Sequence, residues 1–440
     1  MDVIIRNGDK MLKCELTLIF IFCQGLRLSA LCYTKALDAK NLSMEDELSL
    51  NRRLGNVKNE LGVFFMNQAT ALLQDLSEDE SREVSGSALT AAQDLLNSSR
   101  EYLQQGIQLF QTIEDAANIA LLLSNSGRLW RIMGHIKSQT RQSNRNEFGD
   151  QEMVEYKRAI NEYQTALQTL GNRKANPGVW DSVTWELCCT YFTVGTLLQD
   201  QAPLSSLSRD EAEKQVTEYF LKALKYCDTE MSGPRQVVYQ YRAAVIHQRL
   251  ASLYHHSYRC YQPGDNSFRR KKLKQLSENH YSKAASLFFQ LERFGDYLRS
   301  ILENCGLYEA QVEEQTSVGA KKKLYSLVLE TLLESIPALE KMVPSTDKNL
   351  QEKNHPDVSE KSCEETEEET FLIKTLLQRI QATLLALYKI VSNKPAKKGK
   401  EPDPAALQIK TVYGESLSTK SDAVSILALL QKIKQCNLSN

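Results

Sequence analysis

The stretch "YKRAINEYQTAL", Tyr156 to Leu167, decides the fold because its small and aromatic residues share one helical face. Ala159 lies four residues before Tyr163, and Ala166 lies three residues after it. The three side chains therefore project from the same side of an α-helix. Small residues on that side let a second helix approach closely, and the ring fills the remaining gap. We predict that this helix packs as part of a helical pair.

The same pattern, an aromatic residue followed three residues later by Ala, recurs along the chain. It is found in "YTKAL" with Tyr33 and Ala36, in "FLKAL" with Ala223, and nearly complete in "YSKAA" with Tyr281. One amphipathic helix says little about architecture. Several helices with the same packing face indicate a repeated unit.

The helices that should pair with these carry small residues where two helices would touch. They occur in "LGNVKNELG", "NSGRLWRIMG" and "RLASLY", and the residues concerned are Leu54, Gly55 and Gly62, then Gly127 and Gly134, then Leu250, Ala251 and Tyr254. A helix-turn-helix unit of about 34 residues with small residues at these places is typical of the tetratricopeptide repeat (TPR).

A longer internal match supports a repeated helical hairpin. Aligning Tyr102 with Tyr281, an offset of 281 minus 102 or 179 residues, also superposes Asn125 on Asn304 and Gly127 on Gly306. We therefore predict an all-α protein, a TPR-like α-solenoid of degenerate helical hairpins with inserted loops.

Composition agrees with a helical protein and argues against a polyanionic partner. Gly 19 and Pro 10 are few among 440 residues, and 54 basic residues face 55 acidic ones, for a net charge of -1. Such a chain has no overall field to attract a nucleic-acid backbone, which disfavours direct nucleic-acid binding. The ten cysteines mostly stand singly in apolar helical patterns, which favours a reducing compartment.

Breaks in periodicity predict the organisation of the chain. The ranges are an atypical leader from Met1 to Gln24, the TPR-like array from Gly25 to Met342, a disordered acidic linker from Val343 to Thr370, an amphipathic helix from Phe371 to Ser392, a flexible basic linker from Asn393 to Pro404, and a C-terminal segment with a short helix from Ala405 to Asn440. The leader's apolar run, "LTLIFIFC", has eight residues, whereas a membrane span needs about 20. We expect a buried first helix or an alternative leader there, and no membrane span.

No pattern of catalytic or cofactor-binding residues is found. The six histidines include no His-Glu-x-x-His pair, and neither a P-loop nor a dinucleotide fingerprint occurs. His255, His256 and Cys260 resemble a metal set, but adjacent helical residues point about 100° apart. We expect a non-enzymatic protein with no cofactor and no metal.

Four residues are candidates for a partner-binding groove. Asn125 and Asn304 each lie two residues before the small position of a first helix, where TPR side chains line the concave face and an amide can bond a bound peptide. Arg128 and Arg131 follow one turn later as charged companions. The alternative is an Asn that bonds a neighbouring helix or loop.

Two basic clusters are candidates for recognition by nuclear import machinery. They are "RRKKLK", with Arg269, Arg270, Lys271 and Lys272, and "KPAKKGK", with Lys394, Lys397, Lys398 and Lys400. The alternatives are a solvated helix start and a soluble spacer. A phosphate-contact patch is weakly indicated, because we find no aromatic residues interleaved with these charges.

The run "GLRLSALCYTKALDAKNLSMEDELSLNRRLGNVKNELGVFFMNQA", Gly25 to Ala69, and the array that follows resemble the carboxy-terminal part of the erythroid differentiation-related factor family. The resemblance covers Gly25 to Asn440, and Met1 to Gln24 departs from it. It implies a nuclear protein with TPR repeats that takes part in transcriptional activation of globin genes during red-cell differentiation.

These observations together predict a non-enzymatic protein-protein interaction scaffold in transcriptional regulation. Its protein or peptide partners would bind the repeat groove and the amphipathic helix from Phe371 to Ser392. The alternative is a direct DNA-binding transcriptional activator, which needs a basic stripe across successive helices.

Overall fold

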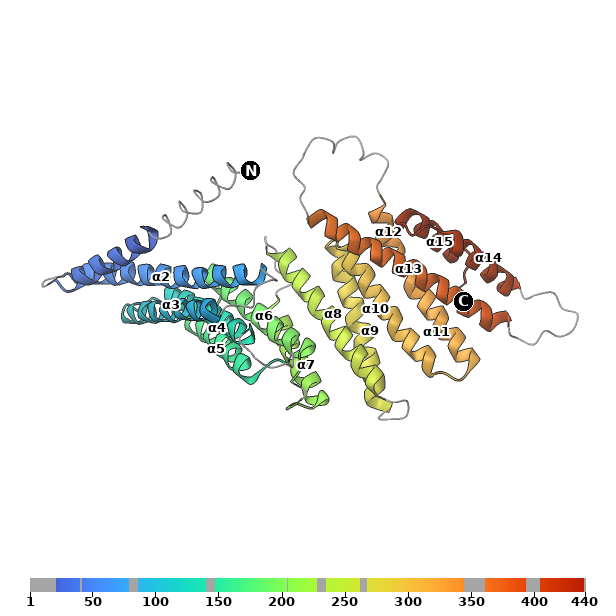
Figure 1. The fold of residues 1–440 in the computed structure, drawn as a ribbon, viewed down its shortest axis with the longest axis horizontal. Helices are drawn as coiled ribbons and strands as arrows, with labels where there is room; N and C mark the ends of the chain where they lie inside the picture. The colour runs from blue at the N-terminus through green and yellow to red at the C-terminus, as the bar shows by residue number, and fades with distance from the viewer. Residues whose placement is uncertain are drawn as a thin grey trace, which may run out of the picture. The chain divides into compact units, whose positions relative to one another are not determined.

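The computed structural model describes residues 21–39, 42–78, 86–139, 147–203, 205–227, 235–261, 267–343, 361–392 and 404–438. Within these ranges every regular element is a helix (Figure 1). The all-α prediction is therefore confirmed. In this described part of the chain, no helix is both long enough and apolar enough to cross a membrane.

The chain forms two compact units, Met1–Tyr226 and Cys227–Asn440. The first contains a helix over 21–37, α2 (Met44–Glu78), α3 (Gly86–Thr112), α4 (Ala116–Gln139), α5 (Asp150–Leu170), α6 (Pro177–Asp200) and α7 (Arg209–Tyr226). The second contains α8 (Gln236–Cys260), α9 (Ser267–Gln290), α10 (Phe294–Glu314), α11 (Val318–Leu333), α12 (Ile336–Met342), α13 (Lys361–Ser392), α14 (Pro404–Ser418) and α15 (Ala423–Gln435).

Consecutive helices pack in pairs, as a helical-hairpin repeat requires. The pairs are α2 with α3, α4 with α5 and α6 with α7 in the first unit, and α8 with α9, α10 with α11 and α13 with α14 in the second. Each unit is thus built as a TPR-like α-solenoid, in agreement with the predicted fold class.

Close approach between a glycine and a large side chain closes each hairpin of the first unit. A Cβ on Gly127 of α4 would lie 2.6 Å from Tyr163 Cε1 of α5, and a Cβ on Gly134 would lie 3.0 Å from Tyr156 Cε2. In the preceding hairpin, Gly55 lies against Phe110 in the same manner. The ring of Tyr163 therefore packs inside its own hairpin.

Most of the residues that the repeat pattern singled out are buried. The buried ones are Leu54, Gly55, Gly62, Gly127, Gly134, Ala159, Tyr163, Ala166, Ala223, Leu250, Ala251, Tyr254 and Tyr281, whereas Tyr33, Ala36 and Gly306 are partly exposed. Gly306 also differs in its surroundings, because a Cβ there would have its nearest neighbour, His255, at 3.6 Å. No close approach requires glycine at this position.

Two tight turns were not predicted from sequence. They join α3 to α4 and α9 to α10, where Glu114 and Glu292 adopt φ angles of 53° and 57°. Each turn is closed by a backbone hydrogen bond between residues five positions apart. Asp115 N donates to Phe110 O, and Arg293 N donates to Phe288 O. Glutamate is not a usual residue for this left-handed conformation, so nothing in the composition marked these breaks.

These turns correct the register of the internal repeat. The equivalent glutamates are 292 minus 114 or 178 residues apart, one fewer than the predicted offset of 179. Phe110 and Phe288 are both fully buried, whereas Phe289, onto which the offset of 179 would place Phe110, is partly buried. The predicted offset was wrong by one residue. It matched identical residue types, whereas the buried positions of the two hairpins match at an offset of 178.

The amphipathic helix that we predicted from Phe371 to Ser392 corresponds to α13, which differs from expectation in where it starts and in what its apolar face contacts. Helix α13 begins at Lys361, ten residues before the predicted Phe371, so that part of the expected linker is helical. Its apolar face packs in the same core as α10 and α11; the buried residues are Leu372, Leu376, Ile380, Leu384, Leu387 and Val391. The face that we expected to dock partners is therefore occupied by the protein itself.

Three further expectations concern the ends and linkers. Helix α14, from Pro404 to Ser418, was not predicted. Residues 344–360 and 393–403 lie outside the described part, so the linkers expected there stay predictions. Of the expected leader only 21–24 is described, and it belongs to the helix over 21–37. That helix contributes Cys23 and Ala30 to a core cluster with Leu54 of α2.

We expect Gly127→Ala to lower the free energy of unfolding of the first unit by about 2 kcal/mol, because the added methyl group overpacks a buried ring. The matched control is Gly25→Ala, in the helix over 21–37, where a Cβ would meet nothing within 4 Å. It should stabilise by about 0.5–1 kcal/mol through helix propensity. Urea unfolding followed by circular dichroism measures both; equal effects of the two changes would contradict the packing role.

The second unit contains a pair of histidines in direct contact. His247 Nδ1 of α8 lies 2.8 Å from His280 Nδ1 of α9, and the ring of Tyr254 is 5.7 Å from that of His280. Burial, followed by the charge of His280, lowers the pKa of His247 to about 4. Burial and then Lys283 lower the pKa of His280 to about 4. The folded unit therefore keeps both rings neutral well below the usual pKa of histidine.

Because these pKa values are lower in the folded than in the unfolded chain, the unfolded chain binds more protons between pH 6.5 and 4. We expect the second unit to lose about 1–3 kcal/mol as the pH falls through this window, after allowance for partial exposure. The double change His247→Asn and His280→Asn should flatten this dependence. Hydrogen exchange of α8 and α9 at several pH values measures it, and an unchanged slope in the variant would refute the assignment.

Candidate functional site

The first helices of successive hairpins form a continuous face in the first unit. Besides their hairpin partners, α4 contacts both α2 and α6, which is how TPR-type arrays build a concave surface. A cavity of 520 Å³ opens on these helices; among its lining residues are Thr70 and Leu73 of α2, Arg128, Arg131 and His135 of α4, and Glu186 of α6. This groove is the candidate site.

Arg131 connects two helices of the groove. Its Nη1 lies 2.5 Å from Glu186 Oε2 of α6. Burial opposes the charge of Arg131, but Tyr163 and Glu186 outweigh it, and the pKa of Arg131 is raised. The same surroundings raise the pKa of Tyr163, chiefly by burial. Arg131 is therefore fixed as a permanent positive charge in the wall of the groove.

Arg128 and His135 present polar atoms at the exposed side of the groove. Both side chains are exposed, and with Arg131 they follow a spacing of three and four residues along α4, which places them on one helical face. Leu73 and Ile132 add apolar lining beside them. A surface with an exposed guanidinium, an exposed imidazole and apolar contacts is suited to a peptide that carries acidic and apolar side chains.

Asn125 lies between α2 and α4. It bonds a neighbouring helix, which was the alternative to contact with a bound peptide. Its side chain is 8% exposed, and Nδ2 donates to Asn59 Oδ1 at 2.8 Å. The amide bonds a neighbouring first helix. It therefore helps to set the spacing of the groove, with one of its amide N–H groups already engaged.

Asn304 lies at a different place from Asn125. It lines a second cavity, of 570 Å³, together with Tyr281 of α9 and Tyr308 of α10. The corrected offset makes Glu303 the equivalent of Asn125. Glu303 Oε1 accepts a long bond of 3.5 Å from Gln248 Nε2 of α8, so Glu303 occupies the first-helix contact that Asn125 occupies in the first unit. The groove position predicted for Asn304 is corrected accordingly.

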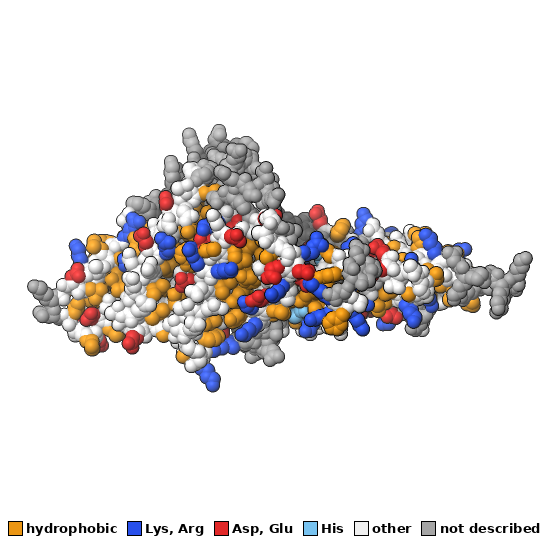
Figure 2. Space-filling model, turned by 90° about the horizontal axis from the view of Figure 1, so that it is seen from below, with side chains coloured by type: hydrophobic (Ala, Val, Ile, Leu, Met, Phe, Trp, Pro, Cys, Tyr) orange, Lys and Arg blue, Asp and Glu red, His pale blue; other side chains and the backbone are white. Residues whose placement is uncertain are grey.

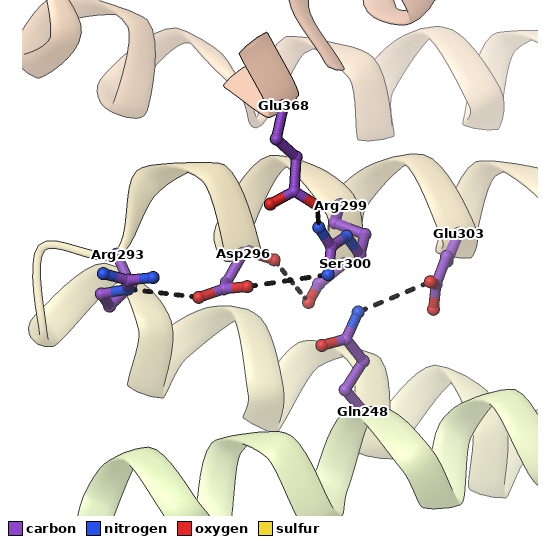
Figure 3. A network of polar contacts seen from close by, with 7 residues as sticks. All are labelled: Gln248, Arg293, Asp296, Arg299, Ser300, Glu303 and Glu368. Carbon is purple, nitrogen blue, oxygen red and sulfur yellow. Dashed lines mark hydrogen bonds and ion pairs between the residues drawn. The ribbon is translucent and has the colours of Figure 1, made fainter. Parts of the chain in front are cut away.

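Polar contacts also connect α10 to α13 in the second unit. Figure 3 shows Arg299 of α10 between Asp296, from its own helix, and Glu368 of α13, with Gln248 and Glu303 on the opposite side. Burial raises the pKa of Glu303, and Gln248 opposes this shift. In the second unit the first helices are thus already bonded to one another along this stretch.

Of the two basic clusters predicted to be recognised by nuclear import machinery, the structure describes only the first. Arg269, Arg270, Lys271 and Lys272 form the start of helix α9. Arg270 forms an ion pair with Glu314 and is only 12% exposed, which leaves its neighbours as the accessible part of the cluster. Lys394, Lys397, Lys398 and Lys400 lie outside the described residues, so import recognition there stays a prediction.

Comparison with known sequences agrees with this architecture. A protein family described as "Erythroid differentiation-related factor 1-like, TPR repeats" matches residues 50–438. The chain belongs to this family.

Relatives within the family are considerably longer than this chain. Erythroid differentiation-related factor 1 of Mus musculus is 36% identical over 422 residues, which cover 93% of this chain and 33% of the relative. The Homo sapiens protein is 42% identical over 315 residues, covering 70% and 25%, and that of Pongo abelii is 37% identical over 403 residues, covering 90% and 33%. A circular tandem repeat protein of solved structure aligns at 11% identity with a TM-score of 0.29, too low to compare the two arrangements of helices.

Several groove residues were not found from the sequence. Thr70, His135 and Glu186 line the cavity, yet none belongs to a recognisable motif. Glu186 is 55 residues from its partner Arg131, beyond the reach of helical spacing rules. His135 could have been found, because it extends the spacing of Arg128 and Arg131 along the same face of α4.

A double-mutant cycle tests the ion pair of the groove. Arg131→Ala, Glu186→Ala and the double variant should give a coupling energy of about 1 kcal/mol, since both side chains are partly buried. The exposed pair Glu218 and Lys222 of α7 serves as control, and its coupling should be about 0.3–0.5 kcal/mol. Urea unfolding measures both cycles, and a groove pair with no more coupling than the control would contradict its structural role.

Proposed function

We propose that this chain is a non-enzymatic scaffold that binds protein partners through the groove of its first unit. The observation that carries the proposal is the 520 Å³ cavity on α2, α4 and α6. The bond between Arg131 and Glu186 preorganises its wall, and the bond between Asn125 and Asn59 connects α2 to α4, two of the helices on which the cavity lies. Arg128 and His135 remain exposed beside it. A preorganised wall lowers the ordering cost of binding an extended peptide.

The partner that this groove favours is a peptide with acidic side chains. Arg128 supplies an exposed guanidinium, which binds carboxylates in a bidentate manner. Leu73 and Ile132 supply apolar contact. Protein-protein interaction is also the general use of stacked helical hairpins.

We further propose a role in transcriptional regulation in the nucleus, with activation of globin genes in erythroid differentiation as its setting. The name of the relatives, erythroid differentiation-related factor 1, supports the erythroid setting. Because the chain spans 33% of the mouse relative's length, the activity of the whole relative enters here only as part of the proposal.

Proximity labelling in erythroid nuclei tests the groove. The variant Arg128→Glu with His135→Glu should lower labelling of groove-dependent partners by about tenfold, since it opposes an acidic peptide with two new negative charges. The control is Lys214→Glu with Lys225→Glu, which changes exposed residues of α7. Identical sets of labelled proteins for wild type and groove variant would refute the groove as the binding element.

A further inference from the structure

The hairpin of α8 and α9 carries a large excess of positive charge. From Gln236 to Gln290 the sequence contains nine Lys or Arg residues against two Asp or Glu residues, although the whole chain has a net charge of -1. The near-neutral total therefore conceals a strongly basic segment. Local charge, and not the total, determines whether a surface attracts a polyanion at physiological salt.

Three segments bring this charge together at one edge of the second unit. Helix α8 ends with Arg259 next to its last residue, and α9 begins with the basic run from Arg269 to Lys274. Arg270 forms an ion pair with Glu314, the last residue of α10. Three residues separate α10 from α11, which begins at Val318 and contains Lys321, Lys322 and Lys323 in its early turns.

We call this surface the basic edge. Its members are Arg259, Phe268, Arg269, Lys271, Lys272, Lys274, Lys321, Lys322 and Lys323. Figure 2 shows the molecule from below, where blue Lys and Arg side chains lie among red Asp and Glu side chains and orange apolar ones. Lys271 and Lys272 are exposed, so their ammonium groups are accessible to a large partner.

The positions of these charges are unfavourable for the helices themselves. Cations near the amino-terminus of a helix oppose its dipole, at a cost of about 0.3–1 kcal/mol each. Helices α2, α5 and α7 follow the usual preference and have acidic residues in their first turns. Helices α9 and α11 have none there and carry basic runs instead. A bound polyanion would remove this repulsion.

Aromatic rings accompany the charges. Phe268, at the start of α9, is 79% exposed. The guanidinium of Arg269 lies 4.9 Å from the centre of the Tyr261 ring, and that of Arg270 lies 4.2 Å from the Tyr258 ring. Tyr258 is buried, whereas Phe268 offers an exposed ring beside these charges.

We propose that the basic edge binds single-stranded nucleic acid. The lysines of α9 and α11 would neutralise successive phosphates, and Phe268 would stack on an unpaired base. A duplex offers phosphates but keeps its base faces stacked inside, and an acidic protein segment offers no base for the exposed ring. RNA and single-stranded DNA share the chemistry that this edge recognises. The proposal revises our expectation, based on total charge, that direct nucleic-acid binding is disfavoured.

Fluorescence anisotropy with the full chain tests the proposal. The probes are a labelled oligouridine RNA and an oligothymidine DNA of about 20 nucleotides each, and a DNA duplex of equal length. The edge variant carries Lys271→Glu, Lys272→Glu, Lys321→Glu and Lys323→Glu. It should bind the single strands at least tenfold more weakly. The slope of log affinity against log salt should become shallower by about 3, since each lost phosphate contact contributes about 0.7.

The control variant has the same change in net charge in the first unit: Lys157→Glu, Lys174→Glu, Lys214→Glu and Lys225→Glu, all at exposed positions. It should bind as wild type does. Phe268→Ala should weaken binding of single strands severalfold and leave the duplex unaffected. The relative affinity of the RNA and DNA probes would identify which strand the edge prefers.

Three results would overturn the proposal. The first is an equal loss of affinity in the edge and control variants, which would assign the effect to total charge. The second is tighter binding of the duplex than of either single strand by the wild-type chain. The third is a polyglutamate peptide that binds more tightly than the oligonucleotides, which would identify an acidic protein as the partner. Circular dichroism of each variant establishes that the helices are retained.

Discussion

The close approach of a glycine in one helix to a large side chain in the next underlies the rest of the first unit. Gly127 against Tyr163 and Gly55 against Phe110 leave no room for a methyl group. This contact sets the distance between the two helices of each hairpin. The first helices can then lie beside one another and present one face. The cavity on α2, α4 and α6 depends on that spacing, because residues of these adjacent helices line it.

The two units share the same hairpin packing but carry different polar side chains on their equivalent faces. Ser99 of α3 donates to Gly62 O, and Ser277 of α9 donates to Ala251 O, so the same hairpin is built twice. The contact between first helices differs, however. Asn125 of α4 bonds Asn59 of α2 in the first unit, whereas Glu303 of α10 accepts a bond from Gln248 of α8 in the second. An amide pair in one place and a half-buried carboxylate in the other give the equivalent faces different chemistry.

Opposite charges are also distributed unevenly in the second unit. Glu368 of α13 pairs with Arg299, while basic residues gather at the starts of α9 and α11. On the two proposals made above, an acidic peptide would bind one surface and the phosphates of a nucleic acid would bind another. The two proposals concern separate units and separate residues, so each stands or fails independently of the other. Their physical basis is local charge on a chain that is neutral as a whole.

The sequence by itself determined the helical class, the repeat and most hairpin breaks, because helical periodicity and small-residue spacing are local properties. Tertiary structure alone decided the register of the repeat, the burial of α13 and the partners of Arg131 and Asn125. The partners of Arg131 and Asn125, for example, lie 55 and 66 positions away in the sequence. Left-handed Glu114 and Glu292 carry no turn chemistry in their side chains. An amphipathic face likewise looks the same in sequence whether a partner or the protein's own core will cover it.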